Sequence, residues 1–147
     1  MANNMFKWVL FNSIVLFVIG YLVRFHDGFN YFIHADATMI GSGIVALYAM
    51  LSLVIGYLIY QSKQISAGLI ALSSTMFVMI GLAGTVIGMM QSLGVLELYD
   101  PKNLQPVVQA FGAHAKGAPI CTVTGIIVSM LTILQACLIR NDFEAVE

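Results

Sequence analysis

Charged residues are the scarcest class in this sequence. Asp, Glu, Lys and Arg make up 9% of its 147 residues, whereas 60% are apolar, and the mean hydropathy is +0.93. Because a soluble domain carries about 25% charged residues, the composition excludes an ordinary soluble protein and predicts an integral membrane protein surrounded by lipid. The formal net charge is −1, and the lack of a basic cluster argues against nucleic acid as a partner.

Cysteines and reactive groups are scarce as well. The two cysteines, Cys121 and Cys137, fall on one predicted helix about 24 Å apart, whereas a disulfide joins Cα atoms within ~7 Å. The sequence also lacks a metal-binding spacing of Cys and His, a nucleophile beside a base, a carboxylate pair and a phosphate-binding loop. We therefore expect no enzymatic activity, no catalytic residues, no metal and no cofactor.

Four long apolar segments predict the fold. They cover residues 5–23, 38–60, 67–93 and 107–139, with approximate ends. Each is long enough to cross most or all of a hydrocarbon core about 30 Å thick. We expect an all-α chain with a single transmembrane domain over residues 1–147, in which four spans leave both termini on one side of the membrane.

The first span and the orientation each allow two interpretations. Lys7 precedes the first apolar segment, as in a signal peptide, but no small-residue cleavage site follows at a suitable distance, so we interpret the segment as an uncleaved anchor. The six Lys and Arg residues divide three against three between the two sides of the predicted bundle. Charge alone therefore leaves the orientation open.

The third span contains an unusual number of small residues. Five of them share one face of a helix: Gly81, Gly84, Thr85, Gly88 and Ser92. Soluble helices avoid so much glycine, because each one costs about 1 kcal/mol relative to alanine. Membrane helices instead use small residues to bring two backbones together, so this face predicts close contact with another helix.

The fourth span has a similar stripe. It consists of Thr122, Gly125, Ser129, Thr132 and Ala136, with Thr124 to one side. Hydroxyl contacts between membrane helices contribute only about 0.6 kcal/mol on average and require no function, so the stripes alone favour helix packing. The alternative is that they line an ion passage or surround a partner helix. Neither span contains Asp or Glu, so a carboxylate that carries protons would have to come from another chain.

Residues 81–90 and 118–127 resemble, in this order, the two signature helices of the MotA/TolQ/ExbB proton channel family. The first contains a Gly-Thr-Val run that includes Thr85, and in the second Thr122 precedes a glycine by three residues. Both features have the family's spacing. The resemblance covers residues 72–140, and two motifs in the correct order are more specific than one.

The resemblance implies a ring-shaped homo-oligomer, a pentamer around a dimer of a single-span partner with an intramembrane Asp. Proton or sodium flow would then drive rotation or other mechanical work at the cell envelope. The implied location is the bacterial inner membrane, with both termini in the cytoplasm. Two other functions remain open: a structural membrane assembly or immunity protein, and an oligomeric pore without a partner.

The resemblance also implies roles for single residues. Thr85 and Thr122 would pass the ion to the partner's carboxylate, and we place further hydroxyls along the pathway or against the partner: Thr124, Ser92 and Ser129. Close approach of helices would depend on Gly81, Gly84, Gly88 and Gly125. Pro119 lacks an N–H group and either provides a hinge in the fourth span or adjusts its packing.

Two departures from the family pattern restrict the function. Other members insert a large cytoplasmic region before the glycine-rich span, whereas this chain has only residues 61–66 there. A role in flagellar torque is therefore not expected. The ExbB-like branch has an acidic residue shortly before the second threonine, where this chain has Lys116. This lysine either alters ion entry or, as we expect, extends towards the outer interface.

Overall fold

The computed structural model describes residues 2–26, 30, 32–33, 36, 38–61, 63, 65–94 and 104–140. Its long elements are four helices: α1 (Ala2–His26), α3 (Ile40–Tyr60), α4 (Ala67–Gly94) and α5 (Leu104–Arg140). All four are long and apolar enough to cross a membrane, so the prediction of an all-α chain with four such helices is confirmed. Their ends lie within three residues of those expected from the sequence.

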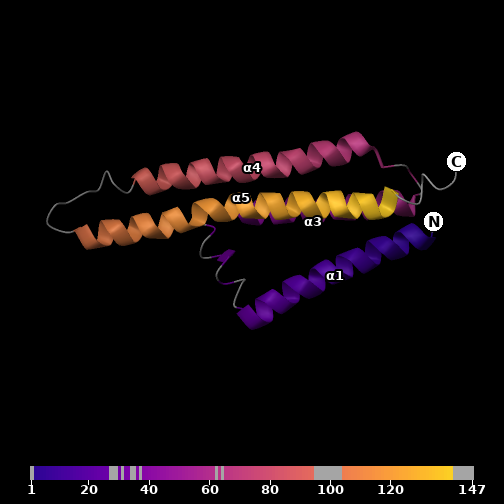
Figure 1. Ribbon diagram of the computed structural model, residues 1–147, viewed down its shortest axis with the longest axis horizontal. Coiled ribbons are helices and arrows are strands. Elements are labelled where there is room, and N and C mark those ends of the chain that lie inside the picture. Colours follow the sequence, from indigo (N-terminus) through magenta and orange to yellow (C-terminus); the bar gives the residue numbers. More distant parts are fainter. Residues whose placement is uncertain are drawn as a thin grey trace.

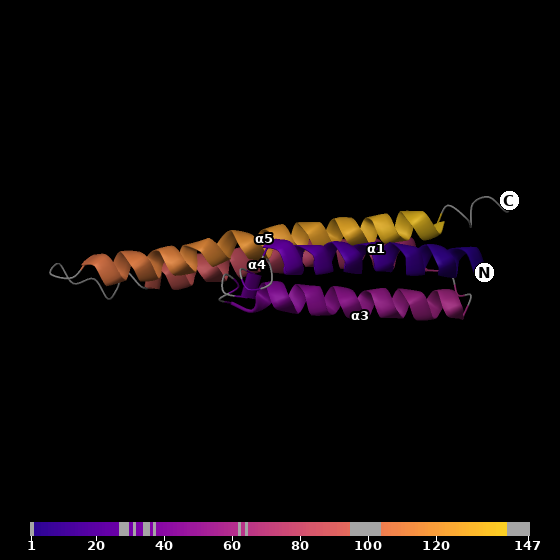
Figure 2. The ribbon, with the colours of Figure 1, turned by 90° about the horizontal axis from the view of Figure 1, so that it is seen from below.

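The helices are arranged around α5. Helices α4 and α5 form a long antiparallel pair, α3 packs against both of them, and α1 contacts α5 and α3 (Figures 1 and 2). The start of α1 and the end of α5 lie at the same end of the bundle. At the other end, α4 and α5 continue well beyond α3 and α1 (Figure 2).

The apolar core lies where α3 meets the α4–α5 pair. Ile44 and Tyr48 of α3 pack there against Phe77 of α4 and Val128 of α5. A second buried cluster lies nearer the termini and consists of Ile55, Ile59 and Ile139. Trp8 and Met5 of α1 pack against it. These two clusters place α3 on one side of the α4–α5 pair.

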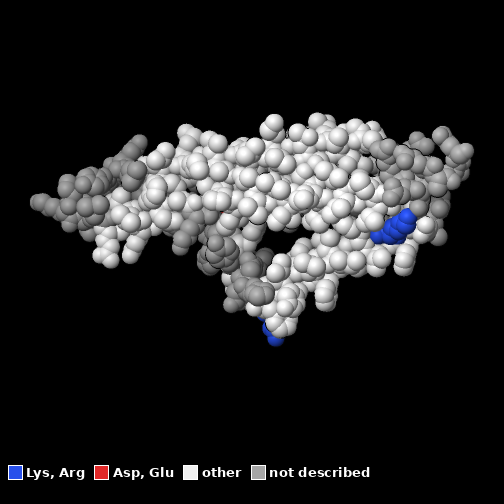
Figure 3. Space-filling model, viewed as in Figure 1, with Lys and Arg blue, Asp and Glu red and all other residues white. Residues whose placement is uncertain are grey.

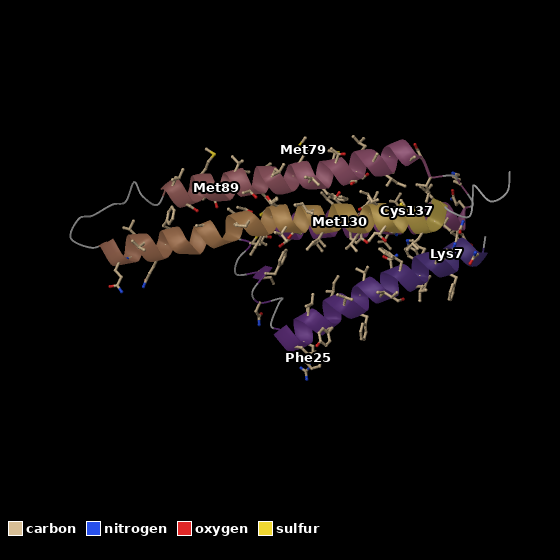
Figure 4. The ribbon with its side chains drawn as sticks, in the orientation of Figure 1. Lys7, Phe25, Met79, Met89, Met130 and Cys137 are labelled. Carbon is tan, nitrogen blue, oxygen red and sulfur yellow. The ribbon has the colours of Figure 1, made fainter. Side chains whose placement is uncertain are left out.

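Helix α1 contacts the bundle only over its first half. Every residue from Leu16 to Phe25 is exposed, and the space-filling view shows an opening between α1 and the other helices (Figure 3). Lys7 lies near the end of α5, whereas Phe25 lies at the far end of α1, away from the other helices (Figure 4). Lys7 and Arg24 are about 26 Å apart along the helix, which places one basic residue near each edge of a hydrocarbon core.

A buried polar cluster joins α1, α3 and α5. Ser52 Oγ donates a hydrogen bond to Asn12 Oδ1 at 2.9 Å, and Gln135 Nε2 donates to Ser52 Oγ at 3.1 Å. Trp8 Nε1 also donates to the Ser52 carbonyl oxygen at 3.2 Å. Because unpaired polar groups are costly in an apolar interior, these bonds favour a single register of α1 against α3.

We expect Gly56→Leu to displace α1, because Trp8 lies directly on Gly56. A Cβ atom at position 56 would be 2.6 Å from Trp8 Cζ2, so a leucine has no room beneath the indole ring. Trp8 is the only tryptophan of the chain, and its fluorescence should be quenched more strongly by brominated lipids once it leaves α3. Gly43→Leu, at an open position of α3, is the control; equal quenching in both variants would contradict this contact.

Candidate functional site

The four glycines highlighted by the sequence lie where α4 meets α5. A Cβ atom at Gly81 would be 2.7 Å from the carbonyl oxygen of Cys121, and one at Gly125 would be 2.5 Å from that of Phe77. At Gly88 the nearest atoms would be Cα and Cβ of Ala118, both at 3.2 Å. The backbone contacts at Gly81 and Gly125 leave no space for a side chain, and the contact at Gly88 is tight, so the two helices touch along their glycines.

Gly84 also allows a third helix to approach the α4–α5 pair. A Cβ atom there would be 2.8 Å from Cys121 Cβ and 2.9 Å from Ile40 Cγ2. Ile40 is the first residue of α3. The Gly84 side of α4 therefore faces α3 as well as α5, and this contact fixes which edge of the pair α3 covers.

Thr85 and Thr122 meet between the two helices. Their hydroxyl groups are hydrogen-bonded to each other, and Thr85 Oγ1 lies 2.8 Å from the carbonyl oxygen of Ala118 and 3.2 Å from that of Gly81. Both threonines are half-buried. The structure thus brings together the two residues that the family resemblance selected, although they lie 37 positions apart in the chain.

The hydrogen bonds define what the pair can offer to a ligand. A hydroxyl group has one proton and two acceptor lone pairs. If Thr85 donates its proton to the Ala118 carbonyl, at 2.8 Å, the proton of Thr122 is donated to Thr85 or to the carbonyl oxygen of Gly81, which lies 3.4 Å from Thr122 Oγ1. The oxygen of Thr122 then keeps both lone pairs, which can accept a hydrogen bond from a protonated carboxyl group or coordinate a cation.

The hydroxyl pair lies on the side of the α4–α5 pair that faces away from α3. Thr85 is about 100° from Gly84 around α4, and Thr122 is about 100° from Cys121 around α5, in both cases away from the residues that contact α3. The neighbouring side chains on that side are large, apolar and exposed: Leu82, Met89, Ile126 and Ile133. Together with Thr85 and Thr122 they form what we call the bare face.

The remaining predicted hydroxyls differ in their surroundings. Ser129 Oγ lies 2.6 Å from Ser74 Oγ in a buried contact between α5 and α4. Ser92 is buried and donates to the carbonyl oxygen of Gly88 in its own helix at 2.9 Å. Thr124 is about 200° from Thr122 around α5, on the side of Val128, which packs against α3. Thr124 is thus apart from the bare face.

Pro119 lies inside α5, which continues through it from Leu104 to Arg140. Its side chain is exposed. Because proline has no N–H group, the carbonyl oxygen of Ala115 loses its intrahelical bond. This interruption falls one residue after Ala118, whose carbonyl oxygen binds Thr85, so a hinge at Pro119 would act next to the hydroxyl pair.

The sequence model of the MotA/TolQ/ExbB proton channel family matches residues 59–147, which is more than half of the chain. This protein belongs to the MotA/TolQ/ExbB proton channel family. The resemblance seen in the sequence is thereby confirmed, and the chain is of a channel type rather than a typical enzyme. Comparison with curated proteins and with solved structures gives no match.

The site lies in the part of this MotA/TolQ/ExbB family member that the family's sequence model matches. Helices α4 and α5 lie wholly within the matched residues 59–147. Helix α1 and all but the last two residues of α3 lie before residue 59. The glycine contacts and the hydroxyl pair are therefore contained in the matched region. Helix α3 packs on the side opposite the bare face, and α1 lies beyond α5 (Figures 1 and 2).

Asp36 is a residue near the site that the sequence did not reveal. It precedes α3 and is 4% exposed; its carboxylate accepts bonds from Ser42 N and Ser42 Oγ, both at 2.7 Å, and from Gly41 N at 3.2 Å. Met39, in the left-handed conformation with φ 55°, turns the chain so that Asp36 can cap α3. Cys121 Sγ of α5 lies 3.8 Å from Asp36 Oδ1.

The hydrogen bonds of Asp36 determine its charge. Burial raises the pKa of this carboxyl group, but the bonds from the Ser42 side chain, the Ser42 and Gly41 amides and Thr38 outweigh it, so the pKa is lower than usual. Asp36 is therefore ionised at neutral pH. It places a negative charge within the protein near the α4–α5 pair, where the sequence indicated no acidic residue.

Proposed function

We propose that this protein is the ring-forming subunit of an ion-driven motor. Five copies would surround a dimer of a single-span partner, and proton or sodium flow would drive rotation or other mechanical work. The observation that carries the proposal is the Thr85–Thr122 hydroxyl pair, held between two helices of the family's matched region and open to the bare face. A structural assembly protein would need the glycines, but not hydroxyls on an uncovered side.

The bare face has the properties of a surface for a transmembrane helix. Leu82 and Ile126 are 46% and 43% exposed and lie beside the hydroxyl pair, so a partner helix would find apolar contacts around one polar point. A partner Asp at this depth would meet Thr122 Oγ1, which can accept a hydrogen bond from the protonated acid. An Asp that has lost this proton can no longer donate the bond to Thr122, and it places a charge in apolar surroundings. Loss of the proton would thus weaken the contact.

The glycine contacts make α4 and α5 suitable as one moving part. Gly81 and Gly125 leave the backbones in contact, and tightly packed interfaces resist gradual deformation. A rigid pair would carry Thr85 and Thr122 together past the partner helix. Each subunit of a ring would then present the same polar point in turn.

The proposed location is the bacterial inner membrane, with both termini in the cytoplasm. The α3–α4 connection would lie on the cytoplasmic side, and the α4–α5 connection on the periplasmic side. Only residues 61–66 separate α3 from α4, which leaves no space for a rotor-binding region of the flagellar kind. We therefore propose that the work is done elsewhere at the envelope.

The test is cryo-EM and ion-flux measurement on the complex purified with the products of neighbouring genes. We expect a ring of five copies with two foreign helices against Thr85 and Thr122, and proton or sodium flux in proteoliposomes that requires both components. A conducting ring with an empty centre would favour the pore without a partner. No ring and no flux would favour the assembly or immunity protein and would refute the proposal.

A further inference from the structure

We infer that Asp36 attracts the conducted cation to the Thr85–Thr122 pair and sets the ion concentration at which conduction is half-maximal. The inference rests on the proposed function and names a residue of this chain that tunes the same site. It assigns a role to a carboxylate that lies outside the region matched to the family. The following contacts and charges support it.

The Asp36 carboxylate is buried but is bound only by neutral donors in the part of the chain that the structure describes. Thr38 Oγ1 donates at 3.3 Å, in addition to the Ser42 and Gly41 groups. The positive end of the α3 dipole, about half an elementary charge, offsets the carboxylate only in part. A net negative charge therefore acts on its surroundings, and buried charges are screened little by salt.

The contact with Cys121 shows that this charge lies close to the hydroxyl pair. Its Sγ atom lies 3.8 Å from Asp36 Oδ1 and 3.4 Å from Thr38 Oγ1. The next residue along α5 is Thr122, with its Cα atom about 3.8 Å from that of Cys121. Asp36 and the hydroxyl pair thus lie about 100° apart around α5, at the same depth.

In the part of the chain that the structure describes, few groups near Asp36 could compensate its charge. Among the described residues, Cys121 of α5 is the titratable group that faces it. Phe32 packs beside it, with Cζ 3.2 Å from the position of a Cβ atom at Gly41, and Thr38 and Ser42 are neutral. In such a medium, with an effective dielectric constant near 20, a unit charge about 10 Å away raises the local concentration of a monovalent cation roughly tenfold.

Capping of α3 is the alternative role of Asp36, and the two roles can be separated. Both oxygens of Asp36 accept bonds, and Met39 rather than Asp36 occupies the N-cap position of α3. Asparagine has no charge and keeps one oxygen, which can accept the two Ser42 bonds. Asp36→Asn should therefore remove the attraction at the cost of the Gly41 bond at the start of α3. Thr38→Val gives the matched control, because it removes one neutral donor and leaves the carboxylate charged.

The experiment measures flux through the intact complex in proteoliposomes as a function of pH, and separately of sodium concentration. For Asp36→Asn we expect the complex to assemble as the wild type does and to reach the same maximal flux. Half-maximal flux should require about tenfold more cation, which for protons is a midpoint about one pH unit lower. Thr38→Val should keep the wild-type midpoint, because the charge remains.

Other outcomes would decide against the inference. A wild-type midpoint in an assembled Asp36→Asn complex would overturn it and leave the proposed function intact. If Asp36→Asn fails to assemble, Asp36→Ser takes its place; failure of both would show that the carboxylate is needed for folding alone and would also overturn it. Absence of wild-type flux under any condition would overturn the proposed function together with this inference.

Discussion

Gly125→Ala is expected to separate α4 from α5, although it adds only one methyl group. The new Cβ atom would lie 2.5 Å from the carbonyl oxygen of Phe77 and 3.2 Å from Cα of Gly81. Both are backbone atoms, so no side-chain rotation relieves the overlap. Overpacking of this kind typically costs about 1–3 kcal/mol, and occasionally more. Separation of the helices would also break the hydrogen bond between Thr85 and Thr122.

The measurement is thermal unfolding of the purified protein in detergent, together with the yield of its oligomer. Gly112→Ala is the matched control, because Gly112 also lies in α5 and, among the described residues, no atom of another helix lies within 4 Å of the position of an added Cβ atom. We expect the control to unfold like the wild type. Equal unfolding temperatures for Gly125→Ala and Gly112→Ala would show that the backbones are not in contact at Gly125.

The α4–α5 contact could be predicted because the residues that form it follow short spacings within each helix. Small residues at steps of three and four mark one face of each helix, and the two helices follow one another in the chain. The face with Gly81, Gly84 and Gly88 is buried in the structure. Periodicity did not show which side of the pair remains uncovered, since that depends on where α3 packs.

The position of Thr124 illustrates this limit. The sequence analysis placed it to one side of the stripe that contains Thr122, but assigned both threonines to the ion pathway or the partner surface. Two residues correspond to about 200° around a helix, and Val128, on the same side as Thr124, packs against α3. Its assignment to the ion pathway remains a prediction, for which the bare face offers no support.

The polar contacts between distant segments could not be predicted from the sequence. Asp36 and Cys121 are 85 positions apart, and Ser52 joins Asn12 and Gln135 across 40 and 83 positions. A single polar residue in an apolar segment has no periodic pattern that reveals its partner. The divergence of α1 after these contacts is equally a product of tertiary packing.

Thr85→Val and Thr122→Val are each expected to reduce ion flux by about 10- to 100-fold in the assembled complex. Valine keeps the shape of threonine, so the glycine contacts should be preserved. It removes a hydroxyl of the pair that would coordinate the conducted cation, and a polar contact with a charged group contributes about 1.5–3 kcal/mol, which corresponds to that range. Thr75→Val is the control, because Thr75 is exposed and, in the described part of the chain, its hydroxyl donates to the carbonyl oxygen of Ala71 in its own helix, at 2.9 Å.

The double variant distinguishes a hydroxyl pair from two independent sites. In the structure Thr122 reaches Ala118 through Thr85, so loss of either hydroxyl interrupts the same chain of bonds. Residues that act as a unit have strongly non-additive effects, and we expect Thr85→Val/Thr122→Val to conduct about as poorly as the worse single variant. Multiplied losses would mean that each threonine contacts the ion separately. Wild-type flux in both single variants would remove the pair from the pathway.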